Sequence, residues 1–193
     1  TTKMTGTVGN INGKYGAGLA YNGYNWINNP IGRRNLVING DIRVSQRPFA
    51  SGTTYTLTSA ANYTADRWYA YQLNETPSTY TVDRSTTTPP QGFRYTLKVQ
   101  RTNGQTGVNP LYLGQAFETD DSIPFQGQTV TLSYYVRAGA TAVTNQANLV
   151  SSVVTGTGTD ESMAKMITAT PTWAGYSLLS TTTVMTASWQ RVI

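Results

Sequence analysis

The chain has 193 residues, enough to bury the core of one domain, and it has no apolar run long enough for a membrane helix. It contains no cysteine and no histidine, which excludes disulfides, thiolate metal sites and the histidine-centred chemistry of most hydrolases. The net charge of +5 arises in residues 1–48, where Asp41 stands alone against the basic residues Lys3, Lys14, Arg33, Arg34, Arg43 and Arg47.

Residues 1–34 are rich in glycine and asparagine and have too few branched apolar residues for a core, which predicts an extended arm. Large side chains interrupt this background, and a free linker would gain nothing by exposing them. Either they pack back on the chain's own domain or they anchor the arm to a neighbouring subunit. The anchoring hypothesis assigns the contacts to Tyr15, Tyr21, Tyr24, Trp26, Arg33 and Arg34. The basic residues form no long run and match no RNA-binding signature, which favours an acidic protein surface over nucleic acid as their partner.

From residue 35 onward the pattern is that of short strands separated by turns. Asn35–Val44 gives two short apolar runs around an Asn-Gly-Asp turn or bulge. Apolar and polar residues alternate over 93–100 and 130–137, which predicts strands with one buried and one wet face. Further strands are predicted at 68–73, 79–84, 111–117, 148–154, 176–179 and 183–193, with turns at 88–92, 103–104, 126–128 and 155–158.

A single stretch, 160–169, favours a helix, and it would form one or two turns in a connection. Short strands at this spacing are typical of a sandwich or jelly roll. The sequence therefore predicts an all-β chain, with a jelly-roll β-sandwich over residues 35–193 and an extended N-terminal arm over 1–34.

Two motifs carry a family resemblance, Asn35–Arg47 and Tyr63–Trp68, and weaker ones follow in the same order. The later motifs are Gly92–Val99, Leu113–Gln115, Phe125–Ala138 and Trp189–Arg191. Together they resemble a jelly-roll module that is widespread in phage tail-fibre and other virion-surface proteins. That module is similar to the family 4/9 carbohydrate-binding modules. The resemblance covers residues 35–193, and the arm matches nothing in it.

The resemblance implies a role on the virion surface, often in host attachment, without specifying a glycan. The first hypothesis is a bacteriophage structural protein of tail-fibre or fibre-adaptor type. Its arm docks to other virion proteins, and its jelly roll is displayed outward as a homotrimer. The second is a capsid decoration or head-fibre protein. The third, from another class, is a secreted carbohydrate-binding module of a bacterial enzyme, which requires a signal peptide and a catalytic domain that this sequence does not show.

Aromatic side chains are the candidates for binding a host glycan, because an aromatic ring suits the C–H face of a sugar. Trp68, at the head of a strand, favours a core role. The candidates for an exposed aromatic patch are Tyr69, Tyr71, Tyr112, Tyr135, Trp173 and Tyr176. The alternative is that these tyrosines lie on the wet face of a sheet without a function.

The densest group of carboxylates suggests a structural calcium ion with oxygen ligands from Asp41, Glu118, Asp120 and Asp121. The alternative is a solvated acidic turn. Asp66 and Arg67 are interpreted as an ion pair or a hydrogen-bonded turn that closes the sandwich. No spacing of acidic residues selects the carboxylate pair of a glycosidase, so we expect no enzymatic activity and no cofactor beyond that calcium.

The segment 183–193 predicts a strand that ends on two apolar residues. Such an end leaves an edge and an apolar face exposed. In the family, the Trp-Gln-Arg strand is followed by at least one more core strand. We therefore expect either that the natural polypeptide continues past Ile193 or that a neighbour or the arm donates a strand.

Overall fold

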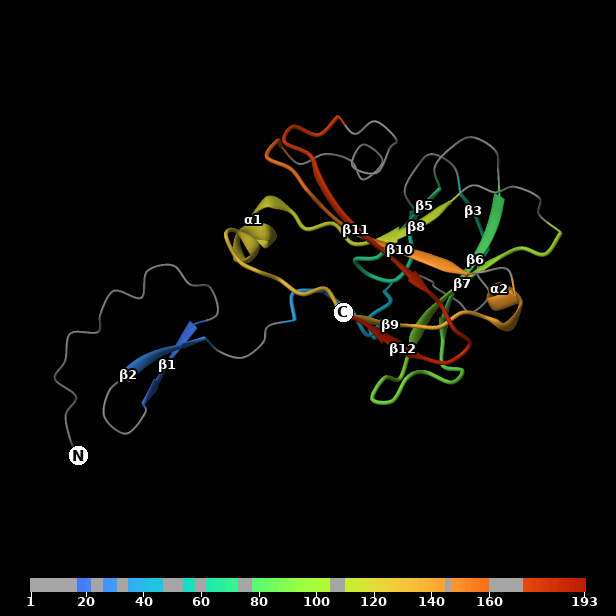
Figure 1. Ribbon diagram of the computed structural model, residues 1–193, viewed down its shortest axis with the longest axis horizontal. Helices are drawn as coiled ribbons and strands as arrows, with labels where there is room; N and C mark the ends of the chain where they lie inside the picture. Colours follow the sequence, from blue (N-terminus) through green and yellow to red (C-terminus); the bar gives the residue numbers. More distant parts are fainter. Residues whose placement is uncertain are drawn as a thin grey trace.

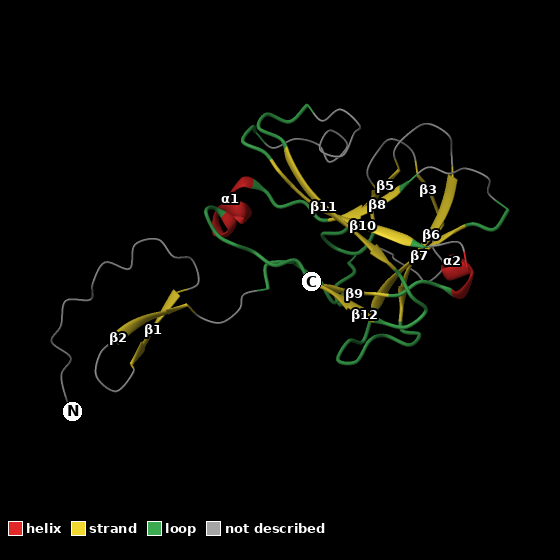
Figure 2. Ribbon diagram, viewed as in Figure 1, coloured by secondary structure: helices red, strands yellow, loops and turns green. Residues whose placement is uncertain are grey.

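In the computed structural model the regular elements are mostly strands, with a few short helices, and long loops connect them (Figures 1 and 2). It describes residues 17–21, 26–30, 35–46, 54–57, 62–72, 78–104, 110–144, 147–159 and 172–193. Every strand pairing in these segments is antiparallel. The all-β class predicted from the sequence is therefore confirmed.

The elements follow one another in an order dominated by short strands. The strands are β1 (Ala17–Tyr21), β2 (Trp26–Pro30), β3 (Thr54–Leu57), β4 (Asn62–Tyr63), β5 (Tyr69–Gln72), β6 (Ser78–Ser85), β7 (Thr96–Arg101), β8 (Leu111–Gly114), β9 (Tyr134–Val136), β10 (Asn148–Thr155), β11 (Ser177–Val184) and β12 (Gln190–Val192). The helices are α1 (Thr119–Ser122), the 3-10 turn η1 (Ile123–Phe125) and α2 (Ala140–Thr144). No helix in the described segments has the length and hydrophobicity that crossing a bilayer requires.

Two three-stranded sheets supply the core, with the strand orders β3-β6-β7 and β4-β5-β8. Ala70 of β5 and Tyr80 of β6 are buried together, and Val99 of β7 and Leu111 of β8 pack against them. Because each sheet contributes side chains to this cluster, the core lies where the two sheets meet. Its apolar contacts are the main stabilising contribution to such a small domain.

Strand β7 shows the predicted alternation. Leu97 and Val99 are half-buried, whereas Lys98 and Gln100 are exposed. Its partner β6 places the fully buried Val82 directly opposite Val99. Local periodicity therefore identified the buried face of β7, whereas residues 93–95 lie before the strand and Phe93, predicted on the buried face, is exposed.

Strand β5 is buried on both faces, because Tyr69, Ala70 and Tyr71 are all inaccessible to solvent. It lies between β4 and β8, and Ala70 faces the cluster shared with Tyr80. A central strand that is covered on both sides shows no alternation in its sequence. This placement therefore buries Tyr69 and Tyr71, two of the candidate glycan-binding residues.

The other sheets have two strands each: β1–β2, β9–β12 and β10–β11. The β1–β2 pair falls inside the predicted arm and places Tyr21 opposite Trp26 (Figure 1). The proposed anchors Tyr15, Tyr24, Arg33 and Arg34 lie outside the described residues, as does the helix predicted at 160–169. The anchoring role of the arm stays a prediction.

Several predicted strands differ from those in the structure: β7 begins at Thr96 rather than at 93, β8 ends at Gly114 rather than at 117, and three further segments differ more strongly. Residues 35–46 form a turn and a loop without strands. Strand β9 begins at Tyr134, so Val130 and Leu132 lie exposed in the loop that leads into it. The strand predicted over 183–193 is divided between the end of β11 and β12, which pairs with β9 instead. In residues 35–46 side-chain hydrogen bonds take the place of strand pairing, and β12 pairs with β9 rather than continuing β11.

Candidate functional site

The first motif, residues 35–46, forms a loop that Asn39 holds in place. Its side-chain amide donates to the carbonyl oxygens of Val44 (2.9 Å) and Asp66 (3.0 Å) and accepts from the Val44 N–H (2.9 Å). Asn39 has φ of 53°, in the left-handed region that asparagine tolerates better than most residues. One side chain thus closes the loop on itself and attaches it to the second motif.

The second motif, residues 63–68, forms a tight turn that the first motif covers. Thr64 and Ala65 are buried, and the Thr64 N–H donates to the Trp68 carbonyl oxygen at 2.8 Å. The half-buried Trp68 donates its indole N–H to the Asn39 carbonyl oxygen at 3.0 Å. A buried indole N–H requires such a partner, so Trp68 has a structural role, as the sequence favoured.

The carboxylate of Asp66 accepts the Gln46 N–H at 2.7 Å and thereby ties the end of the loop to the turn. The hydrogen-bonded turn expected for Asp66 is present, whereas the alternative, an ion pair with Arg67, is not among its contacts. Arg67 instead pairs with Asp121 at 3.1 Å and Glu118 at 3.7 Å. These exposed pairs hold α1 near the turn and contribute at most about 1 kcal/mol each.

Gln115, just after β8, pairs with both backbone groups of Ile38. Its Nε2 donates to the Ile38 carbonyl oxygen at 2.7 Å, and its Oε1 accepts the Ile38 N–H at 2.8 Å. The amide therefore replaces a strand partner for the loop. The Asn-Gly pair at 39–40 gave a signal for the turn, but nothing local marked Gln115 as its partner.

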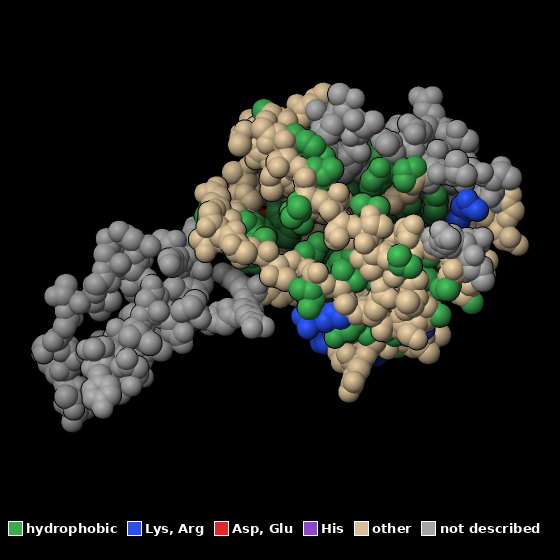
Figure 3. Space-filling model, viewed as in Figure 1, with side chains coloured by type: hydrophobic (Ala, Val, Ile, Leu, Met, Phe, Trp, Pro, Cys, Tyr) green, Lys and Arg blue, Asp and Glu red, His purple; other side chains and the backbone are tan. Residues whose placement is uncertain are grey.

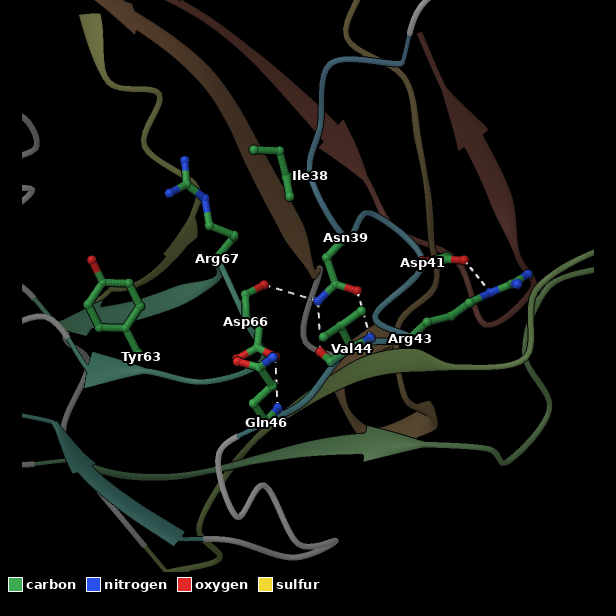
Figure 4. Close-up of a pocket in the computed structure, with 9 residues that line it drawn as sticks. All are labelled: Ile38, Asn39, Asp41, Arg43, Val44, Gln46, Tyr63, Asp66 and Arg67. Carbon is green, nitrogen blue, oxygen red and sulfur yellow. Dashed lines mark hydrogen bonds and ion pairs between the residues drawn. The ribbon is translucent and has the colours of Figure 1, made fainter. Parts of the chain in front are cut away.

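A pocket of about 660 Å³ lies between the two motifs (Figure 4). Its lining residues are Ile38, Asn39, Asp41, Arg43, Val44, Gln46, Tyr63, Asp66 and Arg67. Figure 4 shows the polar groups bonded mainly to one another, with the Asp41–Arg43 ion pair on one side and the Asn39–Asp66 contact in the middle. This arrangement stabilises two loops against each other and sets no nucleophile beside a base.

The predicted calcium site is wrong as a cluster. Asp41 pairs with Arg43, and Glu118 and Asp121 pair with Arg67, so three of the four proposed ligands take part in ion pairs with arginine. Asp120 lies in α1 beside Asp121. Within the described part of the chain, no three acidic, cysteine or histidine side chains gather closely enough to hold a metal ion.

The predicted exposure of Tyr69 and Tyr71 is also wrong, because both are buried in β5. Tyr112 of β8 lies opposite Tyr71, and their ring centroids are 6.2 Å apart. Tyr112 is half-buried. These three tyrosines therefore belong to the packing of the β4-β5-β8 sheet.

The other candidates lie elsewhere in the fold. Trp173 and Tyr176 are half-buried before β11, and Trp173 packs on Gly156 while donating its indole N–H to the Thr159 carbonyl oxygen at 3.0 Å. Tyr135 of β9 is exposed and contacts Phe93. Of the six aromatic candidates, Tyr135 thus keeps the accessibility that a ligand requires.

Burial raises the pKa of the Tyr69 hydroxyl above its usual value of 10.0, and Tyr63 raises it further. The unfolded chain releases this proton at a lower pH than the folded protein does. The stabilising contribution is therefore complete below about pH 10 and is lost as pH rises through the folded pKa.

We expect Tyr69→Phe to make the free energy of unfolding fall less steeply with pH above about pH 10 than in the unmodified protein. Urea unfolding measured at intervals from about pH 8 to about pH 11 gives both slopes. Equal slopes for the two proteins would contradict this assignment.

No family model matches the chain, and neither a curated protein nor a solved structure matches it. A functional proposal therefore depends on the sequence motifs and on the contacts described above. Those contacts assign the two strongest motifs to the scaffold and leave exposed surfaces elsewhere as the candidates for interaction.

Proposed function

We propose that the chain is a non-catalytic structural protein of a bacteriophage virion, of tail-fibre or fibre-adaptor type. In this proposal residues 35–193 form a jelly-roll β-sandwich on the virion surface, and residues 1–34 dock to other virion proteins. The packing of side chains from two three-stranded sheets in one core supports the sandwich.

The observation that carries the proposal is that the two motifs that resemble those of virion-surface modules bond to each other. Asn39, Asp66 and Trp68 all use their polar groups within the loop and turn. A motif of this kind maintains a scaffold rather than a reaction, and it belongs in a module whose role is display and attachment.

A second observation, an exposed apolar face on the β10–β11 pair, supports assembly. The register sets Val154 opposite Leu178 and Val150 opposite Thr182 on one face. Val150 is 59% exposed, Leu178 51% and Val184 67%. On the other face, Ser151 contacts the Tyr134 hydroxyl, and Val153 and Leu179 of that face are exposed as well. The face with Val150, Leu178 and Val184 therefore presents exposed apolar side chains to solvent in the described structure.

The occupant we propose for this face is a second copy of the chain. Neither β10 nor β11 contains a charged residue or a proline, the usual protections of an exposed strand edge. A charged partner would have to desolvate its ions against this surface, whereas a copy of the same neutral Thr, Ser, Val and Leu surface would not. Three copies that turn this face towards a common threefold axis, so that each copy contacts both of the others, form a closed homotrimer, which suits a fibre.

We expect Leu178→Lys to weaken this assembly, because each copy would place a charge in an apolar interface. Light scattering at micromolar concentration should give a trimer for the unmodified protein and smaller species for the variant. Val143→Lys, at an exposed apolar position in α2, is the matched control and should remain trimeric. A monomeric unmodified protein would defeat this part of the proposal.

The function itself is tested on particles. Antibodies to the chain, visualised with gold on purified phage particles, should label the tail or its fibres. Labelling of the capsid shell would replace the proposal with a decoration or head-fibre role. A chain that is absent from purified particles would defeat both.

A further inference from the structure

An arginine–aromatic patch covers the outward face of the β9–β12 sheet. We define it by Phe93, Tyr135, Arg137, Trp189 and Arg191. The register places Arg191 directly opposite Tyr135, so their side chains share a face. Both strands have the burial pattern of an exposed residue between two half-buried ones, and Tyr135 and Arg191 are the exposed residues.

The aromatic rings in the patch are held by contacts on the protein. The rings of Phe93 and Tyr135 meet edge to face with centroids 5.5 Å apart. Trp189 donates its indole N–H to the Thr88 carbonyl oxygen at 2.8 Å, which joins the sheet to the loop that carries Phe93. Phe93 nevertheless remains 37% exposed and Tyr135 44% exposed. The patch therefore offers a fixed and accessible aromatic surface.

The guanidinium groups are also positioned in advance. The Arg137 guanidinium lies 5.1 Å from the centroid of the Trp189 ring, and Arg191 donates to the Ser133 hydroxyl at 3.4 Å. An arginine stacked on a ring keeps the N–H groups at its edge available for a planar acceptor. Stacking restricts the Arg137 side chain and the hydrogen bond to Ser133 restricts that of Arg191, so each loses less conformational entropy when a ligand binds.

The positive charge of the patch has no acidic counterpart in the described segments. Arg137 and Arg191 take part in none of the ion pairs found there, which join Arg43 and Arg67 to carboxylates. Figure 3 shows basic and apolar side chains on the face in view and scarcely any acidic ones. Two arginines whose positive charge is not paired with a carboxylate, beside exposed aromatic rings, favour an anionic ligand with an apolar face.

We propose that this patch binds a carboxylated sugar, such as a uronic acid unit of an acidic polysaccharide. A pyranose presents a C–H face to the Phe93–Tyr135 pair while its carboxylate reaches Arg191. Residues directly opposite in an antiparallel pair lie about 5 Å apart, which suits the width of a single sugar ring. This inference rests on the proposed function, since a virion-surface protein meets host glycans.

A nucleic acid strand fits the patch less well. Strand binding needs a track along which phosphate contacts and open ring faces repeat. Here Arg137 covers one face of Trp189, and one exposed ring pair remains. An acidic peptide would use the arginines but would leave the rings without a partner.

Calorimetric titration of the full chain tests the inference with matched ligands. The probes are an oligosaccharide of galacturonic acid and its methyl ester, which differ in the carboxylate alone. Oligothymidylate and poly-glutamate represent the rival classes. We expect the acid to bind about tenfold or more tightly than the ester, with affinity that falls as salt rises.

Variants locate the site. Arg191→Ala and Tyr135→Ala should each weaken binding of the acid about tenfold, and Arg191→Lys should lie between, because lysine keeps the charge without the planar fork. Lys98→Ala removes an exposed charge from β7 and should leave affinity unchanged. Thermal melts confirm that each variant is folded.

Equal binding of acid and ester, tighter binding of oligothymidylate or poly-glutamate, no binding of the acid, or equal loss in Lys98→Ala would each overturn the inference. The outcome is independent of particle labelling. A chain that is found on particles but does not bind the acid loses this inference alone. A chain that binds the acid but is absent from particles loses the proposed virion function.

Discussion

Asn39→Ala should lower the free energy of unfolding by about 3 kcal/mol and the Tm by about 6–12 °C. The substitution removes three hydrogen bonds, to Val44 and to the Asp66 carbonyl oxygen, and leaves those backbone groups without their partner. It also places alanine at φ of 53°, where a side chain without a local hydrogen bond is strained. Chemical denaturation measures the sum of these effects.

A second substitution separates the two causes. Asn39→Gly removes the hydrogen bonds but tolerates the positive φ, so it should cost about 2 kcal/mol, less than alanine. Asn35→Ala is the matched control, since its side chain accepts one exposed N–H, from Val37. We expect that change to stay within about 0.5 kcal/mol. If Asn39→Ala lowered the free energy of unfolding no more than Asn35→Ala does, the role of Asn39 in attaching the loop to the second motif would be refuted.

Gly114→Ala should destabilise the protein by about 2 kcal/mol, because Gly114 lies directly opposite Tyr69 in the β5–β8 pair. An added Cβ would lie 2.6 Å from the Tyr69 hydroxyl oxygen and 2.8 Å from its Cζ. Tyr69 is buried, so its ring cannot move aside into solvent. The clash must instead displace β5 or β8 at the edge of the core.

Two comparisons make this expectation specific. At Gly139 an added Cβ meets nothing within 4 Å, so Gly139→Ala should stay within about 0.5 kcal/mol of the unmodified protein. In a Tyr69→Phe background the nearest clashing atom is gone, and Gly114→Ala should cost about 0.5–1 kcal/mol less. Denaturation of the four proteins in that cycle gives the coupling. A coupling of zero would contradict the contact.

The local pattern of apolar and polar residues predicted the strands that pair regularly with a neighbouring strand. β6, β7 and β10 have extended segments, and alternation in β7 correctly separated Leu97 and Val99 from Lys98. The pattern predicted β5 as a strand at 68–73, but it could not reveal that Tyr69 and Tyr71 are buried, because burial depends on the packing of segments distant in the sequence. Exposure of an aromatic residue is a property of tertiary packing, and composition does not contain it.

The candidate site likewise combines features that the local sequence predicts with features that depend on distant residues. The turn at Asn39 was predictable from its Asn-Gly sequence, whereas the Gln115 amide that bonds both backbone groups of the neighbouring Ile38 is far along the chain. The acidic residues 118–121 suggested a metal site because sequence shows charges without their partners. Arg67 reaches Glu118 and Asp121 only through the folding of the turn.

Cryo-electron microscopy of intact phage particles tests the proposed virion role most directly. We expect density for this chain on the tail or its fibres, as copies related by a symmetry axis, with the β10–β11 face of each copy covered by its neighbours. The β9–β12 face should remain open to solvent. Particles without this density, or copies whose β10–β11 face is open to solvent, would contradict the account.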